Sequence, residues 1–123
     1  MTQEQLKQFE ELSELFQNRC EIICKILEPL NKNYKYLDDF EIDENKVVGK
    51  GDEYLGYGGT EYHCISFPKE YLYKDDEDIE DLVYIEIVKR NKQRLEEEKN
   101  KKEIKLKREK DEYERLKAKF GGV

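Results

Sequence analysis

The sequence predicts an α+β fold, and three features of the chain point to it. Apolar residues with helical spacing run through the N-terminal part, and short segments rich in aromatic and β-branched residues follow. A long charged stretch without proline or glycine then leads to the C-terminus. We therefore expect an N-terminal helix, a small three- or four-stranded antiparallel sheet, and a long charged C-terminal helix that is a partial coiled coil.

The N-terminal helix is predicted by its cap and by its apolar face. Thr2 can cap the helix, and Gln5 completes a capping box. Pro29 disfavours helical geometry at the residue before it, so the helix should end near Glu28. Spacings of three, four and seven place the following apolar residues on one face: Leu6, Phe9, Leu12, Phe16, Ile23, Ile26 and Leu30.

Residues 34–67 have the pattern of antiparallel strands joined by tight turns. The strand-like segments are KYLDDFEID, KVVGK, EYLGY and TEYHCISF, with DENK and GYGG as two of the turns. Gly56, Gly58 and Gly59 lack the spacing of a dinucleotide-binding or phosphate-binding loop. We interpret them as a hairpin turn that needs positive φ angles.

The C-terminal part is expected to be helical. Pro68 suits the start of a short helix, and residues 75–120 form one long helix that the glycines at 121–122 terminate. The end near residues 79–88 is apolar enough to pack on the rest of the domain. The heptad series beyond it is interrupted by charged residues, so self-pairing is expected only near its end. A possible homodimer would use Leu106, Tyr113, Leu116 and Phe120.

Charge divides the chain into two parts. Residues 1–88, the acidic α+β body, carry 9 Lys/Arg against 22 Asp/Glu, a net charge of −13. Residues 89–123, the basic extension of the C-terminal helix, carry 14 against 8, a net charge of +6. An acidic body is attracted to basic surfaces, including those that normally hold nucleic acid. No apolar run is long enough for a membrane span and no signal peptide is evident, so we expect a cytoplasmic location.

The residue types that could support catalysis or bind a metal do not form a complete site. Cys20 and Cys24 lie on neighbouring turns of the helix, whereas His63 and Cys64 should point to opposite faces of the sheet. A zinc site from this set would need a further ligand, so we expect no metal, no cofactor and no catalytic residue. Any role of these four residues beyond packing stays open.

A binding surface is the more informative prediction. The densest group of carboxylates comprises Asp75, Asp76, Glu77, Asp78, Glu80 and Asp81, and it lacks the spacing of a calcium loop. Asp52 and Glu53 are expected to add to this partner-binding surface from the sheet. Spaced carboxylates on a rigid body can replace phosphates at Lys/Arg sites built for nucleic acid.

The junction ISFPKEYLYKDDEDIEDL resembles small phage and prophage accessory proteins of low-GC Gram-positive bacteria. These typically have a tyrosine-rich hairpin, an FPxxYL-like segment and a Lys/Glu-rich helix, a likeness that covers about residues 40–110. The resemblance implies an accessory protein such as an anti-CRISPR-type inhibitor of a host defence nuclease. Because no catalytic set is present and the body is acidic, we expect a protein of the host cytoplasm that is not an enzyme and binds a nuclease or nucleoprotein complex with a basic groove. The alternative is a structural coiled-coil or nucleic-acid-associated protein that acts through its basic helix.

Overall fold

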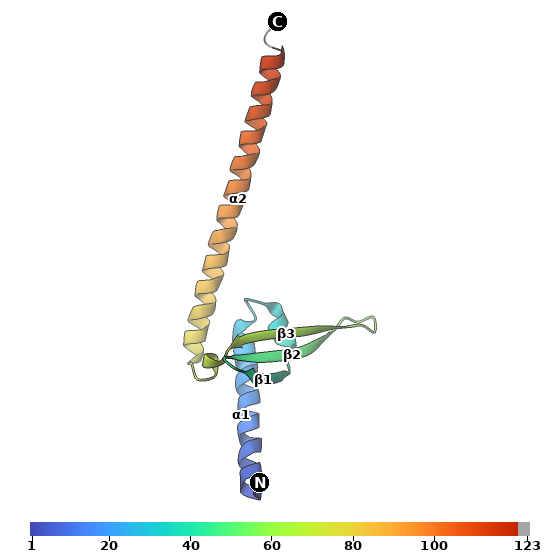
Figure 1. Cartoon of the computed structure of the whole chain (residues 1–123), viewed down its shortest axis with the longest axis vertical. Coiled ribbons are helices and arrows are strands. Elements are labelled where there is room, and N and C mark those ends of the chain that lie inside the picture. Colours follow the sequence, from blue (N-terminus) through green and yellow to red (C-terminus); the bar gives the residue numbers. More distant parts are fainter. Residues whose placement is uncertain (121–123) are drawn as a thin grey trace. The chain divides into compact units, whose positions relative to one another are not determined.

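The computed structural model describes residues 1–120 and confirms the α+β prediction (Figure 1). The elements in chain order are α1 (Gln3–Leu27), η1 (Lys32–Tyr36), β1 (Asp39–Asp43), β2 (Lys46–Tyr54), β3 (Thr60–Pro68), η2 (Lys69–Leu72) and α2 (Asp76–Phe120). The chain divides into two compact units, Met1–Glu86 and Ile87–Val123. The glycine pair expected to stop α2 lies outside the described residues. No helix in the described part of the chain combines the length and the apolar character that a membrane crossing requires.

Helix α1 begins and ends where its sequence predicts. The backbone N–H of Gln5 donates to Thr2 Oγ1 at 3.1 Å, and the N–H of Thr2 donates to Gln5 Oε1 at 2.9 Å, which completes the capping box. The helix ends at Leu27, close to the predicted end, although Glu28 before Pro29 keeps helical φ and ψ angles of −52° and −39°.

The apolar face of α1 is buried over only part of its length, contrary to the simple expectation from its periodicity. Cys20, Ile23, Cys24 and Leu27 of the last turns are buried. Leu6, Phe9 and Leu12 are 47%, 60% and 64% exposed, because the sheet and η elements cover only the C-terminal half of the helix. The predicted apolar face therefore runs along the whole helix, but only its C-terminal part is buried in the described fold.

The sheet has three antiparallel strands in the order β1-β2-β3. The sequence predicts KVVGK and EYLGY as separate strands, but KVVGK and the first two residues of EYLGY belong to one continuous strand, β2, that pairs with β3 from Lys46↔Pro68 to Tyr54↔Thr60. The other three residues of EYLGY lie in the turn after β2. The difference arises because the glycine at position 51, which resembles a strand boundary in sequence, continues the strand. Gly51 is instead an interior strand residue whose missing side chain leaves room for the backbone of η1.

The turn between β2 and β3 confirms the hairpin interpretation. Gly56 and Gly58 have φ angles of 85° and 76°, in the region that only glycine adopts readily. The N–H of Leu55 donates to the carbonyl of Gly59 at 3.0 Å and closes the turn.

The core of the first unit lies between α1, one face of the sheet and the start of α2. Val47 and Phe67 are buried cross-strand partners on that face, and Ile79 and Val83 contribute from α2. Ile85 and Val88, which we expected to pack as well, are 61% and 48% exposed. Six and nine residues beyond Ile79 correspond to about 240° and 180° around a helix, so both side chains leave the buried face.

Candidate functional site

The acidic cluster (Asp75, Asp76, Glu77, Asp78, Glu80 and Asp81) lies at the N-terminus of α2, and all six residues are exposed. The carbonyl of Asp75 accepts hydrogen bonds from the N–H groups of Asp78 and Ile79 at 3.1 and 3.2 Å, so Asp75 is the residue from which the helix starts. Carboxylates in the first turn also stabilise the helix dipole. Since Ile79 is fully buried, the residues beside it are oriented toward solvent.

Arg19 of α1 holds this end of α2 in place. Its Nη2 donates to the carbonyl of Lys74 at 2.6 Å and to that of Tyr71 at 3.2 Å, and its Nη1 pairs with the carboxylate of Asp76. The Arg19 side chain is only 20% exposed. Asp76 therefore has a structural contact of its own, whereas the other five carboxylates have no hydrogen bond or ion pair to another side chain of residues 1–120.

Asp52 and Glu53, the two strand residues predicted to extend the acidic surface, have different surroundings. Neighbours in a strand point to opposite faces, and Asp52 is exposed while Glu53 is partly buried. Glu53 Oε2 lies 2.9 Å from His63 Nε2. Glu53 thus belongs to a second group of side chains on the hairpin.

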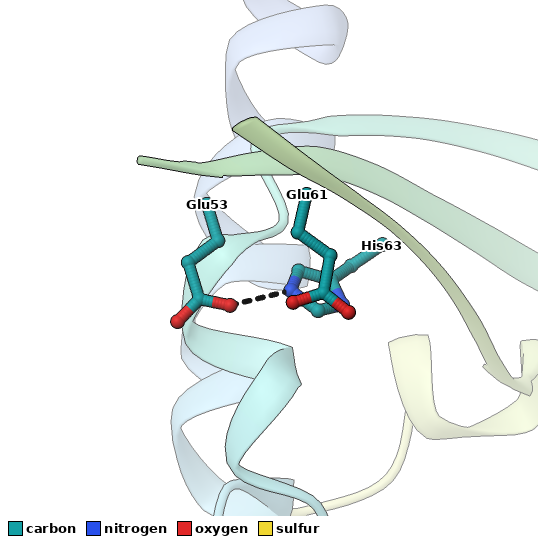
Figure 2. Close-up of side chains that lie close together, drawn as sticks. All are labelled: Glu53, Glu61 and His63. Atoms are coloured by element: carbon teal, nitrogen blue, oxygen red, sulfur yellow. Dashed lines mark hydrogen bonds and ion pairs between the residues drawn. The ribbon is translucent and has the colours of Figure 1, made fainter. Parts of the chain in front are cut away.

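The hairpin cluster consists of Glu53, Glu61 and His63 (Figure 2). Glu53 of β2 and Glu61 of β3 are direct cross-strand partners, and His63 follows Glu61 by two residues on the same face. One ligand atom from each residue lies within 4.8 Å of those of the other two. The imidazole is 8% exposed, and the ring of Tyr36 stacks on it with centroids 5.3 Å apart.

Gly51 makes this packing possible. It is the cross-strand partner of His63, and a Cβ at this position would lie 1.8 Å from the carbonyl oxygen of Tyr36. The absence of a side chain lets η1 approach the sheet closely enough for Tyr36 to cover the imidazole. Lys35 Nζ lies over the Tyr36 ring, 4.9 Å from its centroid.

Hydrogen bonding sets the electrostatics around the hairpin cluster. The hydrogen bond with His63 lowers the pKa of Glu53, and a hydrogen bond with Tyr36 acts in the same direction. A hydrogen bond with Tyr36 raises the pKa of Lys35. Both shifts favour the charged forms of Glu53 and Lys35.

The cysteines are not gathered into a ligand set. Cys20 and Cys24 are buried in α1, and burial raises the pKa of their thiols to about 11 and about 12. Cys64 is exposed, on the sheet face opposite His63, as strand alternation predicts. Within residues 1–120, the only group of three or more potential metal ligands is the hairpin cluster, which sequence reasoning missed.

The signal that could have revealed the hairpin cluster is the strand register. Once Leu55 to Gly59 are assigned to the turn, Glu53 and Glu61 fall opposite each other, and His63 joins them on the same face. The sequence prediction groups His63 with Cys20, Cys24 and Cys64, but Cys64 points to the other face and the two α1 cysteines are not gathered with His63. The sequence prediction does not include Glu61.

The predicted dimerisation residues lie on α2 within the second unit. Leu106, Tyr113 and Leu116 are 65%, 66% and 43% exposed, so their apolar surface is accessible for pairing. The side chain of Phe120 lies outside what the structure describes. Comparisons of the chain with protein-family models, curated proteins and solved structures found no match.

Proposed function

We propose that the protein is a non-enzymatic binding protein, phage-encoded and acting in the host cytoplasm, that inhibits a host defence nuclease complex of the CRISPR type. It does so by occupying a basic surface that normally holds nucleic acid. The proposal rests chiefly on one observation, the exposure of the whole acidic cluster at the start of α2. The resemblance of the hairpin-to-helix junction to phage accessory proteins gives the choice of target.

The charge density of the acidic cluster supports this mimicry. Residues 77–81 contain four carboxylates within about 6 Å of helix rise. Double-stranded DNA carries one charge per roughly 1.7 Å of axis, or about 3.5 charges over the same length. Lys/Arg side chains spaced to meet phosphates would therefore meet carboxylates at a similar density.

The attachment of the cluster to the body also supports the proposal. Arg19 fixes the residues on both sides of Asp75 through two backbone carbonyls and one carboxylate. Because the backbone that carries these carboxylates is already ordered, less conformational entropy is lost on binding, which favours affinity. Asp76 would contribute through position rather than as an unpaired charge, because Arg19 already neutralises it in part.

The test is a DNA-cleavage assay with a panel of purified, guide-loaded CRISPR effector nucleases. The test variant combines Glu77→Gln, Asp78→Asn, Glu80→Gln and Asp81→Asn, and it spares Asp76 so that the Arg19 contact remains. The control variant, with the same loss of four charges, changes Glu96, Glu97, Glu98 and Glu103 to glutamine in the exposed part of α2.

We expect the parent protein and the control variant to inhibit at least one effector, with binding that weakens steeply as salt is added. The test variant should inhibit at least tenfold less well while its thermal transition stays close to that of the parent. If no effector is inhibited, the proposed target class is wrong. If the test variant inhibits as well as the parent, the acidic cluster is not the binding surface.

The exposed apolar residues of α2 favour a second candidate, a coiled-coil or nucleic-acid-associated protein acting through the basic helix. Sedimentation should then show a mass near two chains for the intact protein and near one chain after truncation at Lys105. Nucleic-acid binding that is lost with residues 89–123, and kept when the acidic cluster is neutralised, would favour this candidate over the first. A monomer at all concentrations would exclude the dimer.

A further inference from the structure

The hairpin cluster has a like-charge pair in a position where a strand pair normally avoids one. Glu53 and Glu61 face each other directly across the β2–β3 ladder, and like charges in this arrangement destabilise a sheet. Glu53 is compensated in part by its contact with His63 at 2.9 Å. Glu61 has no ion-pair or hydrogen-bond partner within residues 1–120. The arrangement would be stabilised by one cation placed between the three side chains.

From this geometry we propose that Glu53, Glu61 and His63 form a binding site for a divalent transition-metal ion, with Zn²⁺ as the ion that fits best. The donor set is two carboxylate oxygens and one imidazole nitrogen. Imidazole favours zinc and its neighbours over Mg²⁺ and Ca²⁺, which prefer all-oxygen sites. Three protein ligands leave one position of a tetrahedral zinc open to water or to a group from a partner.

The distances between the three donor atoms suit a zinc site after a small movement of the side chains. Zinc ligands at about 2.0–2.1 Å from the metal lie roughly 3.3 Å from one another in a tetrahedron. The present donor atoms all lie within 4.8 Å of one another, and the His63–Glu53 pair at 2.9 Å would open slightly. Glu61 is exposed, and rotation of its side chain is enough to close the remaining gap. Figure 2 shows both carboxylates directed to the same side of the hairpin as the imidazole.

The imidazole is already held in a fixed position for metal binding. His63 is 8% exposed and its ring is fixed by stacking on Tyr36, so little side-chain entropy is lost when Nε2 binds a metal. Metal binding replaces the Nε2–Glu53 hydrogen bond and requires Nε2 without a proton. The affinity should therefore fall as the pH is lowered and ligand protonation competes with zinc.

The experiment is a titration of untagged full-length protein with ZnCl₂, followed by calorimetry and by the NMR signals of the imidazole. His63 is the only histidine of the chain, so its ring signals report this site alone. Glu61→Gln removes an exposed ligand without touching the core, and His63→Gln removes the imidazole. Glu41→Gln on the exposed side of β1 is the control for charge, and Cys64→Ser is the control for binding by the exposed thiol.

We expect one zinc per chain, with a shift of the His63 ring signals on binding. The loss of either ligand should weaken binding by about tenfold or more, because even the loss of a residue that only hydrogen-bonds to a metal ligand typically costs about 10–100-fold in affinity. Glu41→Gln and Cys64→Ser should bind as the parent does. The proposal is overturned if millimolar zinc leaves the His63 signals unchanged, if Glu61→Gln binds as tightly as the parent, or if Cys64→Ser abolishes binding.

Discussion

Arg19 offers the sharpest test of how the acidic end of α2 is held. Replacing it by methionine keeps most of the aliphatic stem but removes the guanidinium. Three contacts are lost together: those to the carbonyls of Tyr71 and Lys74, and the ion pair with Asp76. All four residues belong to the first compact unit, so the effect is expected in the stability of that unit.

The expected loss in the free energy of unfolding for Arg19→Met follows from how exposed the side chains of Arg19 and Asp76 are. A hydrogen bond to a charged group contributes about 1.5–3 kcal/mol when shielded, and a solvent-exposed ion pair only about 0–1 kcal/mol. The side chains of Arg19 and Asp76 are 20% and 50% exposed, so the ion pair belongs near the lower limit. Taking the two carbonyl contacts at the lower end of their range, and the ion pair near zero, gives a loss of about 3 kcal/mol in the free energy of unfolding. That corresponds to a fall of roughly 10 °C or more in Tm.

The assay is urea unfolding followed by circular dichroism, with Asp76→Asn and the double variant measured alongside. Asp76→Asn alone should cost less than about 1 kcal/mol, because it removes only the exposed ion pair. Lys25→Met, an exposed position on the same helix, is the control and should change little. A loss below about 0.5 kcal/mol for Arg19→Met, within the range of ordinary surface changes, would refute the anchoring role.

Three further predictions concern the hairpin and the thiols. Gly51→Ala should destabilise the protein by about 3 kcal/mol or more in urea unfolding, because its Cβ would overlap the Tyr36 carbonyl. Gly56→Ala has open space around it but a positive φ angle, so it should cost only about 1 kcal/mol. A thiol reagent should modify Cys64 rapidly in the native protein, whereas the two buried thiols of α1 should react only after unfolding. Rapid reaction of all three thiols would contradict the described core. The lowered pKa of Glu53 means that its stabilising contribution is complete above the pKa of about 4.3 of an unfolded glutamate and is lost as the pH falls toward the folded pKa. Thermal unfolding of Glu53→Gln should accordingly decline less steeply than that of the parent between about pH 5 and pH 3.

Local features were the ones that the sequence predicted well. The capping box at Thr2, the end of α1 before Pro29, and the positive φ angles of Gly56 and Gly58 each depend on residues close together in the chain. The same holds for the long helix after Asp75, whose residues favour helix without interruption. Because these signals act within a few residues, they need no knowledge of the tertiary fold.

Features that depend on contacts distant in sequence were missed. The apolar periodicity of α1 predicts which face is apolar but not how far the sheet extends along it, so the exposure of Leu6, Phe9 and Leu12 was unforeseen. The contact of Arg19 with residues 71–76 spans more than fifty positions. The hairpin cluster required the register between β2 and β3, which a difference of one residue in the turn would have changed.

Glu53 links the two proposals and allows them to be separated. As a zinc ligand its charge would be neutralised by the metal, and it would add little to the attraction toward a basic surface. Inhibition that depends on the acidic cluster should therefore be insensitive to zinc and to Glu53→Gln, while zinc binding should be lost in Glu53→Gln and kept when residues 77–81 are neutralised. If Glu53→Gln weakened inhibition in zinc-free buffer and zinc reproduced that effect in the parent, the hairpin would be part of the inhibitory surface. The metal would then regulate it, because one carboxylate cannot bind both zinc and a basic side chain at full strength.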